Sequence, residues 1–216
     1  YQDQDANSAD NPDAIVVHLS TMEDLPFEVT AVDGSGNAVP DYTNTISRGN
    51  PATIRLSCTN QAGRRTCPHL HEEASNAGIS TSGLIFQSTD GEPFFVRIDL
   101  QAGAQAGSVS VKGEAATGRQ FYSAHFHQTE VKVDNGGNFI SVMATEDNTT
   151  LSISTPDPNV AWVGDCDGAV LNRGQSCVLK HTPFALDNAD IGTSISADKD
   201  IVVTSGTWSG KIGNSN

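Results

Sequence analysis

Basic residues are scarce in this sequence. Only 12 Lys and Arg stand against 26 Asp and Glu among 216 residues, which gives a formal net charge of -14 at pH 7. A surface of that sign repels phosphate backbones and anionic lipid headgroups, so nucleic acid and the membrane surface are poor candidates as partners. Divalent cations and cationic patches on other proteins are better candidates. The same charge also serves simply to keep an extracellular protein soluble.

Long apolar runs and catalytic motifs are missing as well. No stretch of the sequence approaches the ~20 apolar residues that a membrane-spanning helix needs. There is no G-x-S-x-G nucleophile elbow, no H-E-x-x-H zinc motif and no glycine-rich phosphate loop before a helix. We therefore predict a protein that is not an enzyme and that does not insert directly into a membrane.

Cysteine is limited to four residues, which fall into two close pairs, Cys58 with Cys67 and Cys166 with Cys177. A short loop closes at little entropic cost, so we predict one disulfide within each pair. Neither spacing is the C-x-x-C of a zinc knuckle or redox site. An oxidising compartment is the simplest explanation, and we expect a secreted or cell-surface protein.

Alternating apolar residues are the dominant pattern along the chain. They occur in IVVHL at 15–19, FEVTAV at 27–32, FFVRIDL at 94–100, FISVMA at 139–144 and IVVTSGTW at 201–208. Segments rich in Asp, Asn, Gly and Ser, such as VDGSGN and EDNTT, separate them and predict turns. The pattern predicts an all-β fold of antiparallel β-sandwiches, Ig-like or jelly-roll-like in type.

The two halves of the chain share an order of motifs. FEVTAVDGSGNAV matches FISVMATEDNTTLSI, RGNPATIRLSC matches NRGQSCVLKHT, and each half then closes with an acidic turn and a strand. Three ordered matches predict a tandem repeat, although any two Greek-key sandwiches share such a rhythm. We expect an acidic segment at 1–13, which is no signal peptide, one sandwich at 14–115 and a second at 116–216. The second is expected to be cut short at its C-terminus, in a processed piece of a longer protein.

Seven residues on alternating positions are predicted to contribute to the core of the second sandwich. They are Phe139, Val142, Leu151, Ile153, Ile195, Val202 and Trp208.

The second half resembles a known family. GRQFYSAHFHQ at 118–128, then NFISVMATEDNTTLSIS, AVLNRGQSCVL and DIGTSISADKDIVVTSGTWSG, is similar to bacterial proteins that carry the IgGFc-binding protein amino-terminal domain. The resemblance covers residues 118–216 and departs from the family at Asp200, where proline is usual. It implies repeated extracellular β-sandwich modules of large surface proteins, used for adhesion or as stalks, and it brings no catalytic residues.

Two groups of residues are candidates for metal binding. His69 with His71, and His125 with His127, form H-x-H pairs. On a strand His125 and His127 share one face and can hold one metal ion together, and Glu72 and Glu73 can supply oxygen ligands beside the first pair, which we expect on a loop. Neither pair completes a tetrahedral site alone, and the alternative is four solvent-facing imidazoles. Asp165 and Asp167, together with Asp187 and Asp190 in a later loop, suit Ca²⁺, although aspartate is also common as a turn cap.

Exposed aromatic residues that can stack on sugars are the third candidate. Phe121, Tyr122, Trp162 and Trp208 are eligible, and we predict that Trp208 is buried, which favours Tyr122 and Trp162. Two functions follow from these observations. One is a non-catalytic extracellular structural or adhesion module, assembled with other protein subunits or surface ligands as a homo-oligomer or filament. The other is a ligand-binding module for a glycan or a metal ion.

Overall fold

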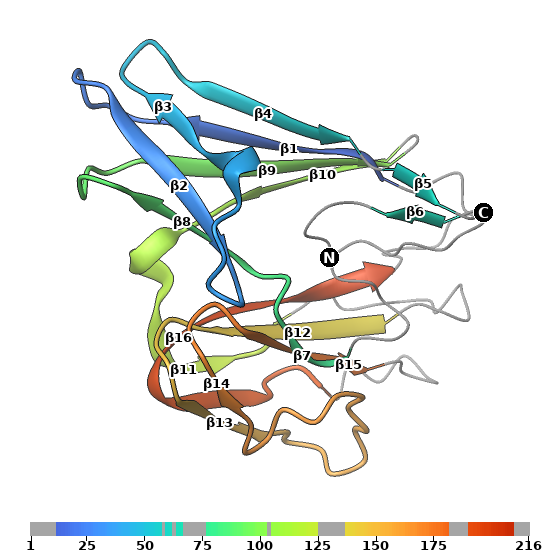
Figure 1. The fold of residues 1–216 in the computed structure, drawn as a ribbon. Helices are drawn as coiled ribbons and strands as arrows, with labels where there is room; N and C mark the ends of the chain where they lie inside the picture. Colours follow the sequence, from blue (N-terminus) through green and yellow to red (C-terminus); the bar gives the residue numbers. More distant parts are fainter. Residues whose placement is uncertain are drawn as a thin grey trace. The chain divides into compact units, whose positions relative to one another are not determined.

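The computed structural model describes residues 12–57, 59–61, 64–66, 77–102, 105–124, 137–181 and 190–209 (Figure 1). These residues form β-strands with two 3-10 turns, η1 (Pro40–Tyr42) and η2 (Gly113–Ala116), and no α-helix. All of the strand pairs are antiparallel. The predicted all-β class is confirmed. None of the described segments is a helix long and apolar enough to cross a membrane.

The chain divides into two compact units. The N-terminal unit comprises Gln2–Glu72 and Leu84–Ala115, and the C-terminal unit comprises Glu73–Gly83 and Ala116–Asn216. The sequence repeat places residues 77–83 in the first sandwich, whereas the structure gives this segment to the C-terminal unit. The order of motifs in the sequence does not reveal that residues 77–83 belong to the C-terminal unit, because a strand pairs with its neighbours in space.

The N-terminal unit contains two antiparallel sheets. One has the order β10 (Gln105–Ser110), β9 (Phe95–Ala102), β1 (Pro12–Ser20) and β4 (Ala52–Ser57). The other has the order β3 (Asn44–Ile46), β2 (Phe27–Asp33) and β8 (Leu84–Ser88), and a separate hairpin joins β5 (Thr59–Gln61) to β6 (Arg64–Thr66).

Alternate residues of these strands form the core of the N-terminal unit. Ile15, Val17 and Leu19 of β1 are buried in one cluster with Phe27, Val29 and Ala31 of β2. Side chains of a strand alternate between its two faces, so the intervening residues of β1, such as His18, lie on the outer face of the four-stranded sheet. The outer face is therefore free to carry polar groups.

The C-terminal unit is built around one unusually long strand, β16 (Ser194–Ser209). Its first part pairs with β11 (Gly118–Tyr122) and β13 (Thr149–Ser154), and its second part pairs with β12 (Gly137–Ala144). The sheet continues through β15 (Ser176–His181) to β7 (Gly78–Ser80) on one side and ends at β14 (Val170–Leu171) on the other. Because β16 changes partners along its length, the sheet curls around its core in a barrel-like form (Figure 1).

The core of this unit agrees in part with the seven predicted residues. Val142, Leu151 and Ile195 are buried, and Ile153 packs against them. The predictions for Phe139 and Val202 were wrong, since both residues lie on the opposite face of their strands, where they are half-buried. A shift of one position moves a strand residue to the other face. The side chain of Trp208 lies outside the described residues.

The short strand β7 is held against β15 by close backbone contact. Its three residues pair with Ser176, Cys177 and Val178. Gly83, just after this strand, approaches the backbone so closely that an added Cβ would lie 2.8 Å from the carbonyl oxygen of Gly174. Glycine at position 83 therefore lets the 77–83 segment reach the C-terminal unit.

Candidate functional site

Two turns of the C-terminal unit, residues 145–148 and 172–175, and residues 198–200 of β16 come together through side-chain hydrogen bonds, and we name these three segments the motif turns. The Asp147 Oδ1 atom accepts a hydrogen bond of 3.0 Å from the backbone N–H of Arg173. The Asn172 Oδ1 atom accepts one of 3.2 Å from the N–H of Asn148. The sequence placed these turns far apart, and it is the curled sheet that joins them.

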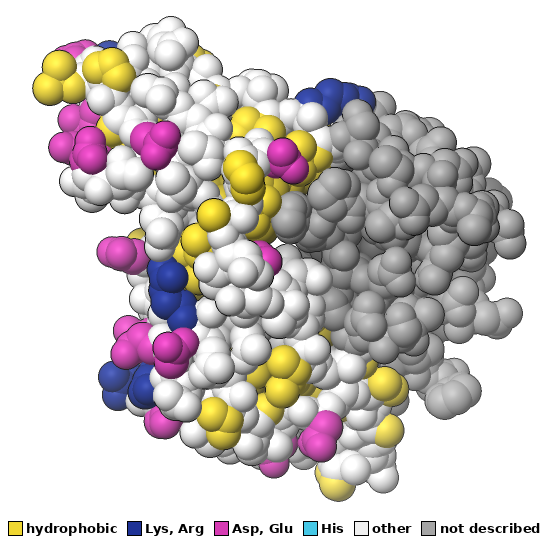
Figure 2. All heavy atoms as spheres, viewed as in Figure 1, with side chains coloured by type: hydrophobic (Ala, Val, Ile, Leu, Met, Phe, Trp, Pro, Cys, Tyr) yellow, Lys and Arg dark blue, Asp and Glu magenta, His cyan; other side chains and the backbone are white. Residues whose placement is uncertain are grey.

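The third segment, residues 198–200 of β16, is tied to the first by hydrogen bonds. The Asp198 carboxylate accepts a hydrogen bond of 2.8 Å from the backbone N–H of Thr150. The Asp200 carboxylate lies 3.2 Å from the Arg119 Nε atom, and its carbonyl accepts from the Thr145 hydroxyl. Figure 2 shows acidic and basic side chains next to one another on this side of the unit.

The motif turns therefore have a structural role in the geometry described here. Their carboxylates and amides satisfy backbone N–H groups that the sheet leaves unpaired, which stabilises tight turns. Asn148 adopts a positive φ of 55°, a conformation that asparagine tolerates better than most residues. These residues bring no nucleophile and general base together.

A disulfide fixes the loop that precedes β14. Cys166 and Cys177 are joined with a Cα–Cα distance of 5.8 Å, and both are buried in the core. The predicted pairing of these two cysteines is confirmed. The predicted pairing of Cys58 with Cys67 lies outside the described residues.

The two aspartates beside this disulfide are exposed. The Asp167 Oδ1 atom accepts a hydrogen bond of 2.8 Å from the backbone N–H of Ile153 within β13. In the part of the chain that the structure describes, no group of three His, Cys, Asp or Glu side chains is placed to hold one metal ion. His69, His71, Glu72, Glu73, His125, His127 and Asp187 lie outside that part. Calcium at Asp165 and Asp167, and a metal at the H-x-H pairs, stay predictions.

A buried polar cluster lies at one end of the C-terminal core, and we define it as Ser123, Asn138, His181, Asp190 and Thr193. The Asn138 amide donates to the Asp190 carboxylate over 3.2 Å. The Ser123 hydroxyl donates to the Asp190 carbonyl over 2.7 Å and accepts from the Thr193 N–H over 3.1 Å. The cluster fastens the start of β16 to the end of β11.

The two predicted sugar-stacking residues have different surroundings. Trp162 is half-buried, its indole N–H donates to the Thr155 hydroxyl over 2.8 Å, and its ring lies 5.6 Å from the His181 ring. Tyr122 is 63% exposed on β11, and its hydroxyl accepts a hydrogen bond from the Gln120 amide. Stacking of a sugar on either residue stays a prediction, and Tyr122 offers the larger free surface.

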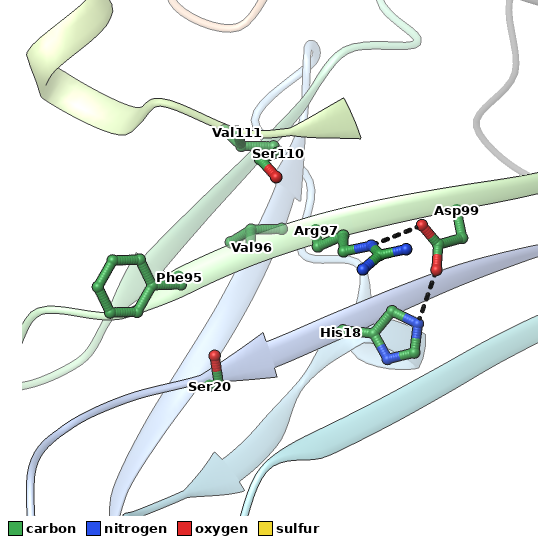
Figure 3. A pocket seen from close by; sticks show the side chains of 8 residues that line it. All are labelled: His18, Ser20, Phe95, Val96, Arg97, Asp99, Ser110 and Val111. Atoms are coloured by element: carbon green, nitrogen blue, oxygen red, sulfur yellow. Dashed lines mark hydrogen bonds and ion pairs between the residues drawn. The ribbon is translucent and has the colours of Figure 1, made fainter. Parts of the chain in front are cut away.

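A polar network that the sequence analysis missed crosses the outer face of the four-stranded sheet (Figure 3). The His18 Nε2 atom lies 3.1 Å from the Asp99 Oδ2 atom, and the Arg97 Nε atom donates to Asp99 Oδ1 over 2.8 Å. The His18 Nδ1 atom lies 3.1 Å from the Thr53 hydroxyl, and Arg97 also donates to the Ser108 hydroxyl over 2.9 Å. The network therefore joins all four strands of this sheet.

The network lines one side of a shallow groove. The groove also contains Ser20, Phe95, Ser110 and Val111, and Phe95 is 64% exposed. Hydrogen bonds from Ser108 and Arg97 lower the pKa of Asp99, so this carboxyl is ionised at neutral pH. The only sequence signal for the groove was the alternation of Phe95, Arg97 and Asp99 on one face of a strand.

The geometry defines an all-β, disulfide-containing module with a groove on its surface. A comparison with protein families matches residues 107–216, slightly more than half of the chain, to the family described as IgGFc binding protein. The chain belongs to this family, as the resemblance predicted, and the matched domain is of a non-catalytic, binding type. No curated protein and no solved structure matches the chain.

Proposed function

We propose that this chain is an extracellular module that acts in adhesion or in building a surface structure. The observation that carries the proposal is the use of the motif turns, which lie within the matched domain. Their carboxylates and amides bind backbone groups of the same unit. The module therefore meets partners through its exterior, by strand edges and shallow grooves, and needs no reaction centre.

Two further features support an extracellular location. The buried Cys166–Cys177 disulfide is of the kind that forms and persists in oxidising compartments. The net charge of -14 keeps such a module soluble at a crowded surface. The partners that suit this surface are other protein subunits, including further copies of the chain, and ligands displayed on surfaces.

Bead clustering tests the proposal. The full chain is attached by one terminus to polystyrene beads at several densities, and clustering is scored among the beads and on slides coated with the same chain. We expect clustering that rises steeply with coating density, because many weak contacts add to high avidity. Beads that carry the chain unfolded by reduction in urea are the control. If the beads stay single at every coating density, both among themselves and on the coated slides, the proposal is wrong.

A second candidate function is binding of a carboxylated sugar in the groove of the N-terminal unit. The observation that favours it is the exposed ring of Phe95, two residues from Arg97 on the same face of β9. Such residues are about 6.6 Å apart along a strand, which suits one pyranose ring. An aromatic ring stacks on the apolar face of a sugar, and a guanidinium recognises a carboxylate.

Titration with glucuronate, followed by NMR, tests this second candidate, with glucose as the matched neutral ligand. We expect glucuronate to shift the amide resonances around Phe95 and glucose to shift them far less. Phe95→Ala should weaken the glucuronate response at least about tenfold, in line with the loss of a stacking contact, while Tyr122→Ala leaves it unchanged. Equal shifts with both sugars, or a response lost only in Tyr122→Ala, would exclude this groove.

A further inference from the structure

We propose that strand β10 is the edge at which a second copy of this chain adds, so that two four-stranded sheets join into one. The inference deepens the proposed function and rests on it. The pairing is antiparallel and two-fold symmetric, with each copy presenting the same edge to the other.

β10 is an open edge in the part of the fold that the structure describes. It pairs with β9 alone, in an unbroken register from Gln105 opposite Ala102 to Ser110 opposite Arg97. Residues 108–111 are all exposed, including Val109 at 58% and Val111 at 44%. An open edge with exposed valines is a template for another strand.

The backbone alternation shows which groups face outward. The Val111 N–H donates to the Val96 carbonyl over 2.9 Å, which makes this pair a hydrogen-bonded one. In an antiparallel ladder such pairs alternate with pairs that exchange no backbone bonds. The N–H and C=O groups of Ser108 and Ser110 therefore point away from β9, toward the position of an added strand.

The other described edge strands carry features that discourage pairing. β3, β5, β6 and β7 have three residues each and β14 has two. β4 carries Arg55, and β11 carries Arg119 beside an irregularity in its pairing with β16. β8 has no charge, but its five residues are half-buried. Short length, charge and irregular pairing are the usual protections of sheet edges, and β10 has none of them.

The β10 edge suits a second copy because it carries no charge of its own. Two molecules that each carry a net charge of -14 repel one another, so contact is favoured where neither presents a charged group. The β10 sequence QAGSVS contains no charged residue and no proline. An antiparallel pair of identical strands needs no other complementary sequence, and dense display on a surface raises the effective concentration of the second copy.

Sedimentation velocity of the full chain over a wide concentration range tests the inference. Ser110→Pro removes an outward N–H without touching the bonds to β9, and Ser110→Ala removes the side chain but keeps that N–H. We expect a reversible dimer in the wild type and in Ser110→Ala. Ser110→Pro should raise the dimer dissociation constant at least about tenfold, the effect of one lost hydrogen bond at a site that cannot replace it.

Hydrogen exchange on the wild type gives an independent readout in case Ser110→Pro folds poorly. We expect the amides of Ser108 and Ser110 to gain protection as concentration rises, while the amide of Val111 is protected at every concentration. A wild type that stays monomeric with unprotected Ser108 and Ser110 amides overturns the inference. So does a dimer that Ser110→Pro does not weaken.

The bead assay separates this inference from the proposed function. Wild-type beads that cluster, with Ser110→Pro beads that cluster equally, keep the adhesive function and reject β10 as its edge. Clustering that is lost in Ser110→Pro and retained in Ser110→Ala supports both.

Discussion

The Nδ1 atom of His181 lies 3.7 Å from the Oδ1 atom of Asp190, and both side chains are buried in the C-terminal unit. The same carboxylate accepts a hydrogen bond from the Asn138 amide, and the His181 ring faces Trp162. Residues of β12 and β15 thus meet at one aspartate that precedes β16.

We predict that Asp190→Ala lowers the free energy of unfolding by about 1 to 3 kcal/mol, because it leaves a buried amide without its acceptor. Urea denaturation followed by circular dichroism measures the change. Asp165→Ala is the matched control, since the Asp165 side chain is exposed, and it should change stability by less than about 0.5 kcal/mol. Equal effects of the two variants would show that the cluster adds nothing to stability.

Two valines on neighbouring strands test which face of the C-terminal sheet is the core. Val142 is fully buried, and Val202 lies half-buried on the other face. Val142→Ala should destabilise the chain by about 2 kcal/mol, from two lost methyl groups and the cavity that remains. Val202→Ala should cost clearly less. Thermal unfolding of both variants measures the difference, and the reverse ranking would refute the assigned faces.

Removal of the Cys166–Cys177 disulfide should lower the free energy of unfolding by about 3 kcal/mol, the loop-entropy value for a separation of 11 residues. The double variant Cys166→Ala, Cys177→Ala is compared with the oxidised wild type by urea denaturation. Because both cysteines are buried, mild reductant should leave the folded wild type oxidised. A loss under about 0.5 kcal/mol would mean that the disulfide does not constrain the unfolded chain.

The pairing of Cys58 with Cys67 remains to be measured by peptide mapping without reduction. We expect a peptide that joins these two residues and a second one that joins Cys166 to Cys177. The reason is that each pair closes a short loop within one half of the sequence. A peptide linking Cys58 to Cys166 or Cys177 would contradict both the pairing and the tandem arrangement.

The Asp99 carboxyl should make stability depend on pH. Its pKa is lowered in the folded state by hydrogen bonds from Ser108 and Arg97, so its contribution is present above the unfolded pKa, about 3.9. That contribution is lost as pH falls through the lower, folded pKa. Asp99→Asn should therefore melt below the wild type at pH 6, and the difference should shrink toward pH 2. A difference independent of pH would show that the carboxylate charge is not involved.

The class of the fold could be predicted from the sequence because strand alternation and turn residues are local signals. FISVMA and IVVTSGTW became β12 and the second part of β16, and the segments VDGSGN and EDNTT contain the turns that follow β2 and β12. The near neighbours Cys166 and Cys177 were also paired correctly, since a loop of that length leaves little choice. The resemblance of residues 118–216 identified the family that the match over residues 107–216 confirms.

Only the tertiary structure decided which faces and which partners those strands have. Phe139 and Val142 differ by an odd number of positions and cannot share a face, but neither local apolarity nor turn chemistry says which of them points inward. The transfer of β7 to the C-terminal unit, the meeting of Asp147 with Arg173 and the network of His18, Arg97 and Asp99 depend on contacts between distant segments. Such contacts follow from how a sheet curls and closes around its core, and the sequence of one strand does not specify which strands become its neighbours.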